Sequence, residues 1–284
     1  MKTRIGSISI LLALTIFSCE NHDEISMVMI DGFSLYWDHE VFGEEGRRLR
    51  FQVTTTDEYD NDYELVFNTD VDDRSITARL VKNVDEGKCQ YYPMPVIGNH
   101  DPHKCSASGG FYLTDKELDN GIYSLKIVTP SFEVTSELTI ADEQVTLEVP
   151  ANNHLTSSFK YVYPIPKKLL FGGIVYQASE NTNDAQEFFN ELTNLGLTET
   201  TVPNYPYRYL SVDENGRATS SNWEPDYHTI GFLYKMNDID FKTIVEASKK
   251  YFNQSNLNIY LHTSNGDEGL MSKTEGITVV YGPQ

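Results

Sequence analysis

Apolar and polar residues alternate along the first half of the chain in short runs. These runs are rich in β-branched and aromatic residues, and acidic or Gly/Asn turns separate them. They cover Leu49–Thr54, Glu64–Asn68, Ser75–Lys82, Gly110–Leu113, Ile122–Val128, Phe132–Ile140 and Gln144–Val149. Strands in this number, without a convincing helix, predict an all-β antiparallel sandwich over residues 27–149.

The period of the pattern changes after residue 168. Asp184–Leu195 and Asp240–Phe252 each place their apolar residues on one stripe of a helix. The predicted strands around these helices are Leu169–Tyr176, Tyr207–Val212, Thr219–Ser221, Thr229–Met236, Asn258–His262 and Ile277–Tyr281, with a hairpin turn at Asp213–Gly216. The order resembles the β-α-β-β-α-β layer of ferredoxin-like folds with one extra strand, so residues 169–284 are expected to form an α+β domain.

One hairpin in the first half carries a more specific pattern. Residues 118–125 read Leu-Asp-Asn-Gly-Ile-Tyr-Ser-Leu. This resembles the Leu-x-x-Gly-x-Tyr-x-Leu entry into the penultimate strand of Ig-like and fibronectin-like domains. The resemblance implies that Tyr123 lies at a corner, with its ring in the core and its hydroxyl bonded to nearby backbone. The alternative is any hairpin with an Asn-Gly turn.

The N-terminus has the layout of a secretory signal. Lys2 and Arg4 precede an apolar run, residues 8–17, which at about 1.5 Å per residue is too short to cross a bilayer core of roughly 30 Å. The run ends in Ile-Phe-Ser-Cys, which resembles the lipobox of bacterial lipoproteins. That resemblance implies a signal peptide over residues 1–18 and lipidation of Cys19. An ordinary secretory signal with an incidental cysteine is the alternative.

The residues after Cys19 are acidic. Glu20, Asp23 and Glu24 resemble the export tag of surface lipoproteins in the Bacteroidota, and an ordinary start of an acidic protein would look the same. We expect an exported outer-membrane lipoprotein, surface-exposed or periplasmic, whose membrane contact is made by its acyl chains. The predicted organisation is a signal peptide (1–18), an acidic tether (19–26), an Ig-like sandwich (27–149), a proline-punctuated linker (150–168) and an α+β domain (169–284).

Charge narrows the classes of partner. The chain has 22 Lys and Arg residues against 42 Asp and Glu residues, a formal net charge of −20. A surface this acidic repels phosphate, so no nucleic-acid partner is expected. The oligomeric state is not predictable from the sequence.

Two cysteines remain if Cys19 is acylated. Cys89 and Cys105 would lie in an oxidising compartment, where a disulfide is the favoured interpretation. Zinc bound by these two cysteines with His100 and His103 is one alternative, although the spacing is not that of a familiar zinc finger. Two free thiols are the other alternative.

No catalytic or cofactor motif is present in the sequence, so neither a catalytic residue nor a cofactor is predicted.

Acidic residues crowd one turn, where hard oxygen ligands would suit Ca²⁺. They are Asp57, Asp60, Asp62 and Glu64. The order of the EF-hand is absent, and a solvated acidic hairpin is the favoured interpretation.

Aromatic residues give the last candidate site. Tyr205, Tyr207 and Tyr209 share one face if their segment is extended, and Trp223 and Tyr227 follow the next hairpin. Such a row could stack on sugar rings or on a protein, or it could be the core of the second domain. The sequence thus predicts non-catalytic binding of a glycan or protein at the cell surface. An envelope hydrolase with its site in the C-terminal domain, and a fimbrial subunit, are the alternatives.

Overall fold

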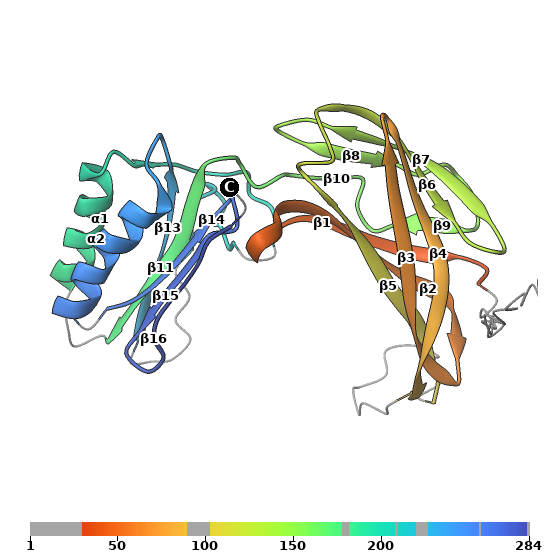
Figure 1. Ribbon diagram of the computed structural model, residues 1–284, viewed down its shortest axis with the longest axis horizontal. Helices are drawn as coiled ribbons and strands as arrows, with labels where there is room; N and C mark the ends of the chain where they lie inside the picture. Colours follow the sequence, from red (N-terminus) through yellow and green to blue (C-terminus); the bar gives the residue numbers. More distant parts are fainter. Residues whose placement is uncertain are drawn as a thin grey trace, which may run out of the picture.

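The computed structural model describes residues 30–89, 103–177, 182–207, 210–219, 227–255 and 257–282. Strands dominate the described residues, and they form one large curled sheet and a second, smaller sheet that carries two α-helices (Figure 1).

The large sheet has ten strands in the order β10-β8-β7-β6-β4-β3-β5-β2-β1-β9. Their bounds are β1 Phe33–Phe42, β2 Gly46–Tyr59, β3 Asn61–Asp72, β4 Ser75–Lys88, β5 Cys105–Thr114, β6 Gly121–Val128, β7 Glu133–Ile140, β8 Val145–Glu148, β9 Leu155–Ser157 and β10 Tyr161–Val162. A short 3₁₀ helix, Gly43–Glu45, joins β1 to β2. The segment predicted as a linker, 150–168, contributes β9 and β10 to this sheet.

The large sheet curls until its two ends pack against each other. Residues from β1 and β2 at one end and from β7 and β8 at the other belong to one buried apolar cluster, which includes Trp37, Phe51, Leu138 and Val145. Shifts of register in β2 and β3 interrupt the ladders, and such bulges bend and twist long strands. A single continuous sheet is therefore wrapped around the first core.

This arrangement differs from the predicted sandwich in one respect. All ten strands are hydrogen-bonded in one order, and β3–β5, β4–β6 and β1–β9 are parallel pairs, so an antiparallel sandwich of two separate sheets is not confirmed. Tyr123 nevertheless lies as expected. It is buried in the first core, and its hydroxyl accepts from the backbone N–H of Asp119 at 2.9 Å and donates to the Asp119 carbonyl at 3.0 Å.

The second sheet has six strands in the order β12-β13-β11-β14-β15-β16. Its elements are β11 Leu169–Gln177, α1 Thr182–Asn194, β12 Thr198–Glu199, β13 Tyr227–Lys235, α2 Phe241–Gln254, β14 Asn258–Thr263, β15 Glu268–Ser272 and β16 Gly276–Val280. Both helices cover the same face of this sheet (Figure 1). Asp240 begins α2 as its N-cap, since its carboxylate accepts from the backbone N–H of Thr243.

Most predicted elements of the second half are present. The strands predicted at 207–212 and 219–221 are not present in their described residues, which form only an isolated bridge, Val212 to Ala218, around the Asp213–Gly216 turn. Residues 208–209 and 220–221 lie outside the described residues. β15 was not predicted, and β1 is missing from the prediction of the first half.

Apolar residues also lie between the two sheets. Val41 of β1 packs with Phe171 of β11 and Leu233 of β13 in a third buried cluster. Beside it, His39 is buried, and its Nδ1 accepts from the backbone N–H of Ile165 at 3.3 Å, while its Nε2 lies 3.8 Å from an oxygen of Asp115. Arg47 pairs with the same carboxylate at 3.0 Å. His39 thus joins β1 to the segment that leads into the second sheet.

The burial of His39 predicts a loss of stability on acidification. Desolvation lowers the pKa of His39 in the folded protein, so between that pKa and about 6.5 the unfolded chain binds a proton that the folded chain does not. Stability should therefore fall as the pH drops below about 6.5 toward the folded-state pKa, by at most about 1.4 kcal/mol per pH unit. Urea unfolding should show a flatter profile for His39→Gln. An unchanged slope in this variant would contradict the argument.

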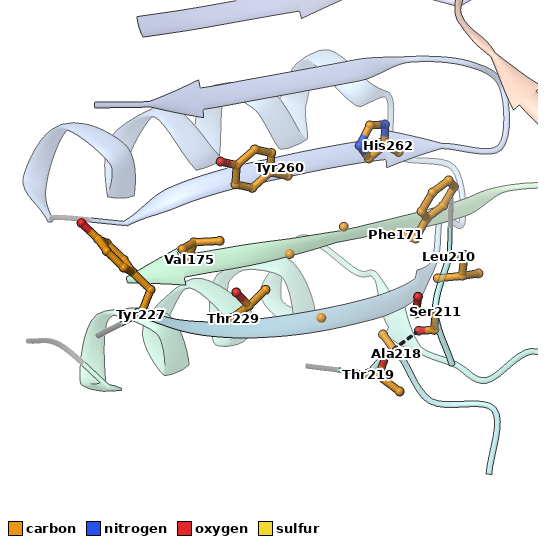
Figure 2. Close-up of a pocket in the computed structure, with 13 residues that line it drawn as sticks. Phe171, Val175, Leu210, Ser211, Ala218, Thr219, Tyr227, Thr229, Tyr260 and His262 are labelled. Atoms are coloured by element: carbon orange, nitrogen blue, oxygen red, sulfur yellow. Dashed lines mark hydrogen bonds between the residues drawn. The ribbon is translucent and has the colours of Figure 1, made fainter. Parts of the chain in front are cut away.

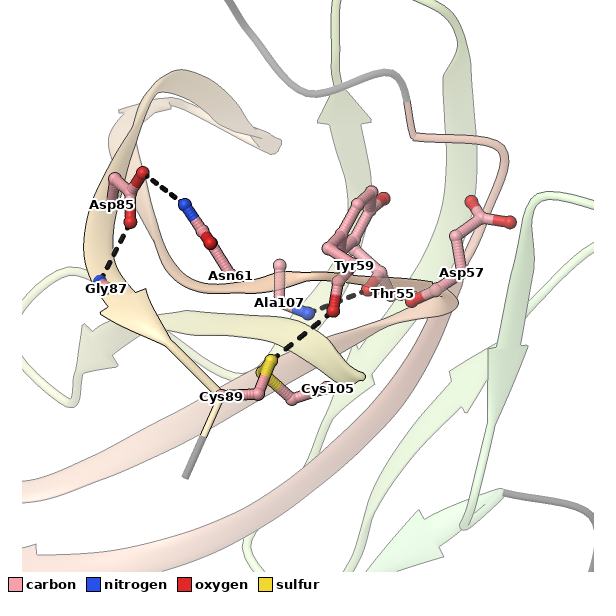
Figure 3. The surroundings of a disulfide bond; sticks show 9 residues. All are labelled: Thr55, Asp57, Tyr59, Asn61, Asp85, Gly87, Cys89, Cys105 and Ala107. Carbon is pink, nitrogen blue, oxygen red and sulfur yellow. Dashed lines mark hydrogen bonds between the residues drawn. A yellow bond between two sulfur atoms is a disulfide. The ribbon is translucent and has the colours of Figure 1, made fainter. Parts of the chain in front are cut away.

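A disulfide joins the end of β4 to the start of β5. Cys89 follows β4 and Cys105 begins β5, with their Cα atoms 5.8 Å apart (Figure 3). The Cys89 sulfur lies 3.3 Å from the carbonyl oxygen of Tyr59 in β2. The predicted pairing is confirmed, and because both sulfurs are used, the alternatives of zinc ligands and free thiols do not apply.

Replacing both Cys89 and Cys105 with serine should lower the free energy of unfolding. The bridge closes a loop of sequence separation 16, for which the chain-entropy model gives about 3 kcal/mol. Urea unfolding of the double variant against the oxidised protein measures this loss. A loss near zero would show that the unfolded chain is already constrained around this loop.

Candidate functional site

The second sheet has one face that neither α1 nor α2 covers, and a groove of about 550 Å³ lies on it (Figure 2). Strands β11, β13 and β14 form its floor, and the segment from Leu210 to Thr219 forms one wall. The lining residues are Phe171, Gly172, Gly173, Val175, Leu210, Ser211, Ala218, Thr219, Tyr227, Thr229, Gly231, Tyr260 and His262. Grooves of this size suit a small ligand or part of a larger one.

The alternation of side chains along the strands places these residues on the uncovered face. Ile174, Phe232 and Leu261 point into the core under the helices, so their neighbours in sequence point the other way. Those neighbours include Val175 and Tyr260, and both line the groove.

Glycines make the floor of the groove deep. Gly173 is paired with Gly231 of β13 on one side and with Tyr260 of β14 on the other. A Cβ atom on Gly173 would lie 3.6 Å from the Ile230 carbonyl oxygen and from the Thr229 side chain, which is ordinary van der Waals contact, so a methyl group fits on the floor of the groove. A Cβ atom on Gly231 would meet the wall at Ala218 and Thr219. The groove therefore lies between Tyr260 on β14 and this wall, which stands over Gly231 on β13. These two strands flank β11, so they are two strand spacings, or roughly 10 Å, apart.

Hydroxyl groups and one imidazole supply the polar part of the lining. The side chain of Thr219 donates to the carbonyl oxygen of Ser211 at 3.2 Å, which holds the wall together. Tyr227 stands at the end of the groove, where its hydroxyl accepts from Gln177 at 3.4 Å. Tyr260 is 37% exposed, so its ring is accessible from the groove.

His262 closes the opposite end. Its ring stacks on Phe171 with 5.5 Å between the ring centroids. Burial lowers the pKa of His262, and Glu268 on the neighbouring strand opposes this shift only in part. The imidazole is therefore neutral at physiological pH and offers one donor and one acceptor.

Two adjacent glycines of β11 should respond in opposite ways to alanine. Gly173→Ala should raise the free energy of unfolding by about 0.5–1 kcal/mol, because it removes backbone freedom and its methyl group fits. Gly172→Ala should lower it by about 1–3 kcal/mol, since its Cβ would overlap the carbonyl oxygen of Tyr260. Urea unfolding of the two variants tests the pair, and equal effects would contradict the described floor.

The predicted tyrosine row lies at the junction of the two sheets. Tyr205 contacts the rings of Tyr163 and Tyr207 edge-on at 5.7 and 5.3 Å, and it packs against both the first core and the cluster between the sheets. Tyr207 is only 7% exposed. Burial raises the pKa of Tyr205 to about 12 and raises that of Tyr207 further. These two rings are packed among neighbours, while Tyr209 and Trp223 lie outside the described residues.

Among the three described members of the predicted set, Tyr227 alone lines the groove. Sequence reasoning missed the rest of this lining. The sequence feature that could have indicated the groove is a set of glycines inside predicted strands, Gly172, Gly173 and Gly231. Glycine within a strand often marks the close approach of a ligand or of other backbone.

The acidic residues proposed for Ca²⁺ lie around the turn between β2 and β3, two strands that are not paired with each other. A carboxylate oxygen of Asp57 accepts from the backbone N–H of Asp31 at 3.0 Å, Asp60 lies in the turn, and Asp62 and Glu64 are exposed on β3. Among the described residues no group of three or more His, Cys, Asp or Glu side chains is placed to hold a metal ion. Calcium binding at this turn stays a prediction.

The predicted lipidation site, Cys19, lies outside the described residues. No helix in the described part of the chain is long and apolar enough to cross a bilayer. No family model, curated protein or solved structure matches the chain. The groove's own geometry is therefore what supports a function.

Proposed function

We propose that this protein is a lipid-anchored envelope protein that binds a glycan, non-catalytically, in the groove of its second sheet. The observation that supports the proposal is the groove over Gly173 beside the accessible ring of Tyr260. A pyranose ring has an apolar C–H face and a rim of hydroxyls. An aromatic ring over a flat glycine floor suits the apolar face, and the hydroxyls of the lining suit the rim.

The chemistry of the lining favours binding over hydrolysis. A glycosidase needs two carboxyl groups on either side of the scissile bond. None of the described lining residues is Asp or Glu, and the neutral imidazole of His262 has no acidic partner within this lining. The groove can therefore hold a sugar through stacking and hydrogen bonds.

The proposal includes the finer features of the fold. We propose that the curled sheet is an Ig-like domain that acts as a spacer, and the hydroxyl of Tyr123 bonded to the Asp119 backbone supports this. We propose that the second sheet is a ferredoxin-like domain, because β11-α1-β12-β13-α2-β14 follows that order and its four strands lie as β12-β13-β11-β14. A lipid on Cys19 would hold both at the outer membrane.

A glycan array probed with the chain from Glu20 onward tests the function. Binding to a defined glycan is expected, and calorimetry with that glycan should then give at least about tenfold weaker binding for Tyr260→Ala and for Gly173→Val. A Cβ atom at position 173 meets no atom closer than 3.6 Å and valine suits a strand, so the variant should remain folded while its side chain narrows the groove.

Tyr161→Ala is the matched control. Tyr161 is 45% exposed on the edge strand β10 of the large sheet and is not among the residues that line the groove, so its loss should leave glycan affinity unchanged. Absence of binding across the array, or binding that folded Gly173→Val retains, would contradict the proposal. Binding to a protein instead would place the ligand in the other class that the sequence predicts.

A further inference from the structure

The last strand of the second sheet has an unpaired edge. β16 pairs with β15 over all five of its residues, and among the described residues no strand pairs with its other side. Its backbone N–H and C=O groups on that side face solvent. Ile277 is 41% exposed, and Val280 and the following Tyr281 are also exposed.

This edge lacks the features that protect most edge strands. Natural edges carry charges, prolines or bulges that prevent another strand from pairing. Gly276–Gly282 contains no charged residue and no proline, although charged residues make up 23% of the chain. The register between β15 and β16 is also unbroken by a bulge. The edge of β16 is thus suited to pairing with another strand.

The other sheet edges in the described structure are too short to be its partner. β12 has two residues, β10 has two and β9 has three. Pairing of β16 with any of these in another molecule would leave two or three of its five residues unpaired. The edge that equals it in length is β16 itself.

We propose that two copies of this chain associate through their β16 strands, antiparallel and centred on Thr278. This register places Ile277 opposite Val279 and Gly276 opposite Val280, so apolar side chains meet and no like charges oppose each other despite the net charge of −20. Pairing of a strand with its own copy closes after two subunits and cannot extend into a filament.

The dimer has a consequence for the groove. Directly opposed residues of antiparallel strands point to the same face of a sheet. Val279 packs against the core under the helices, so the helices of both copies lie on one face and both grooves open on the other. Two grooves on one side would bind neighbouring units of a polymer or a surface with increased avidity. The association itself does not depend on what the grooves bind.

Sedimentation velocity of the chain from Glu20 onward tests the association. The expected result is a concentration-dependent dimer that becomes a monomer in Thr278→Lys, because two lysines would then face each other at the centre of the pair. Ser124→Lys is the matched control, since Ser124 is exposed on β6 of the large sheet, and this variant should remain a dimer.

A cysteine at position 278 tests the register. Opposed Cα atoms in antiparallel strands are about 4.5–5.5 Å apart, which is within the range of a disulfide. Thr278→Cys should form a covalent dimer under mild oxidation, and Ser124→Cys should not. A monomer at all concentrations, or a dimer unaffected by Thr278→Lys and not cross-linked through position 278, would overturn the proposal.

Discussion

Replacement of Trp37 with alanine should lower the free energy of unfolding by about 3–5 kcal/mol. Trp37 lies on β1 and is fully buried. Its ring stacks on Phe51 with 6.0 Å between centroids, and Phe51 stacks on Phe111 at 4.9 Å, so these rings connect three neighbouring strands of the large sheet. Truncation would leave a cavity at the centre of this stack.

The indole of Trp37 also fixes the segment that joins β9 to β10. Its Nε1–H donates to the carbonyl oxygen of Phe159 at 3.0 Å and lies 3.2 Å from the Ser157 hydroxyl. Trp37→Phe keeps most of the apolar volume and removes this donor, so it should cost about 1–2 kcal/mol. The difference between the two variants separates packing from hydrogen bonding.

Urea unfolding measures these losses, with Tyr36→Ala as the control. Tyr36 is the neighbour of Trp37 in sequence, points to the opposite face of β1 and is 37% exposed, so its truncation should cost about 1 kcal/mol or less. Equal losses for Trp37→Ala and Tyr36→Ala would contradict the assignment of Trp37 to the core.

Replacement of Arg48 with methionine should cost about 3–5 kcal/mol. Arg48 lies opposite Glu40 across the β1–β2 pair, and its guanidinium donates to one Glu40 oxygen through Nε at 2.8 Å and through Nη2 at 2.6 Å. Glu40 is fully buried. Removal of Arg48 would leave this carboxylate in the interior with Arg50 as its nearest cation, 3.7 Å away.

A second substitution should rescue this loss. Glu40→Met combined with Arg48→Met removes both charges, and such apolar replacements of buried pairs are often neutral or stabilising by about 1–4 kcal/mol. A double-mutant cycle from urea unfolding gives the coupling between the two side chains. Additive losses in the cycle would contradict the pairing.

The same residues explain why β1 escaped sequence reasoning. The run from Phe33 to Phe42 contains Asp38, His39 and Glu40, which interrupt its apolar pattern. Asp38 and Glu40 are nevertheless buried because the register places Arg50 and Arg48 directly opposite them. Sequence alone does not give the register between strands, so it could not show that these charges have partners.

The groove was not predicted from the sequence for a related reason. Gly173 and Gly231 are distant in sequence and become neighbours only through the pairing of β11 with β13. The tyrosine row was the more visible signal, but aromatic spacing does not distinguish an exposed face from a packed one. The contacts between the two sheets decided that Tyr207 is buried.

The sequence by itself determined the features that depend on neighbouring residues. Apolar periodicity predicted α1, α2 and most strands, and the number of cysteines in an oxidising compartment predicted the Cys89–Cys105 disulfide. The tertiary structure alone decided the curl of the large sheet, the burial of the Asp38 and Glu40 charges, the groove and the free edge of β16. These features depend on which strands pair and in which register, and that choice is made by the burial of side chains from distant parts of the chain.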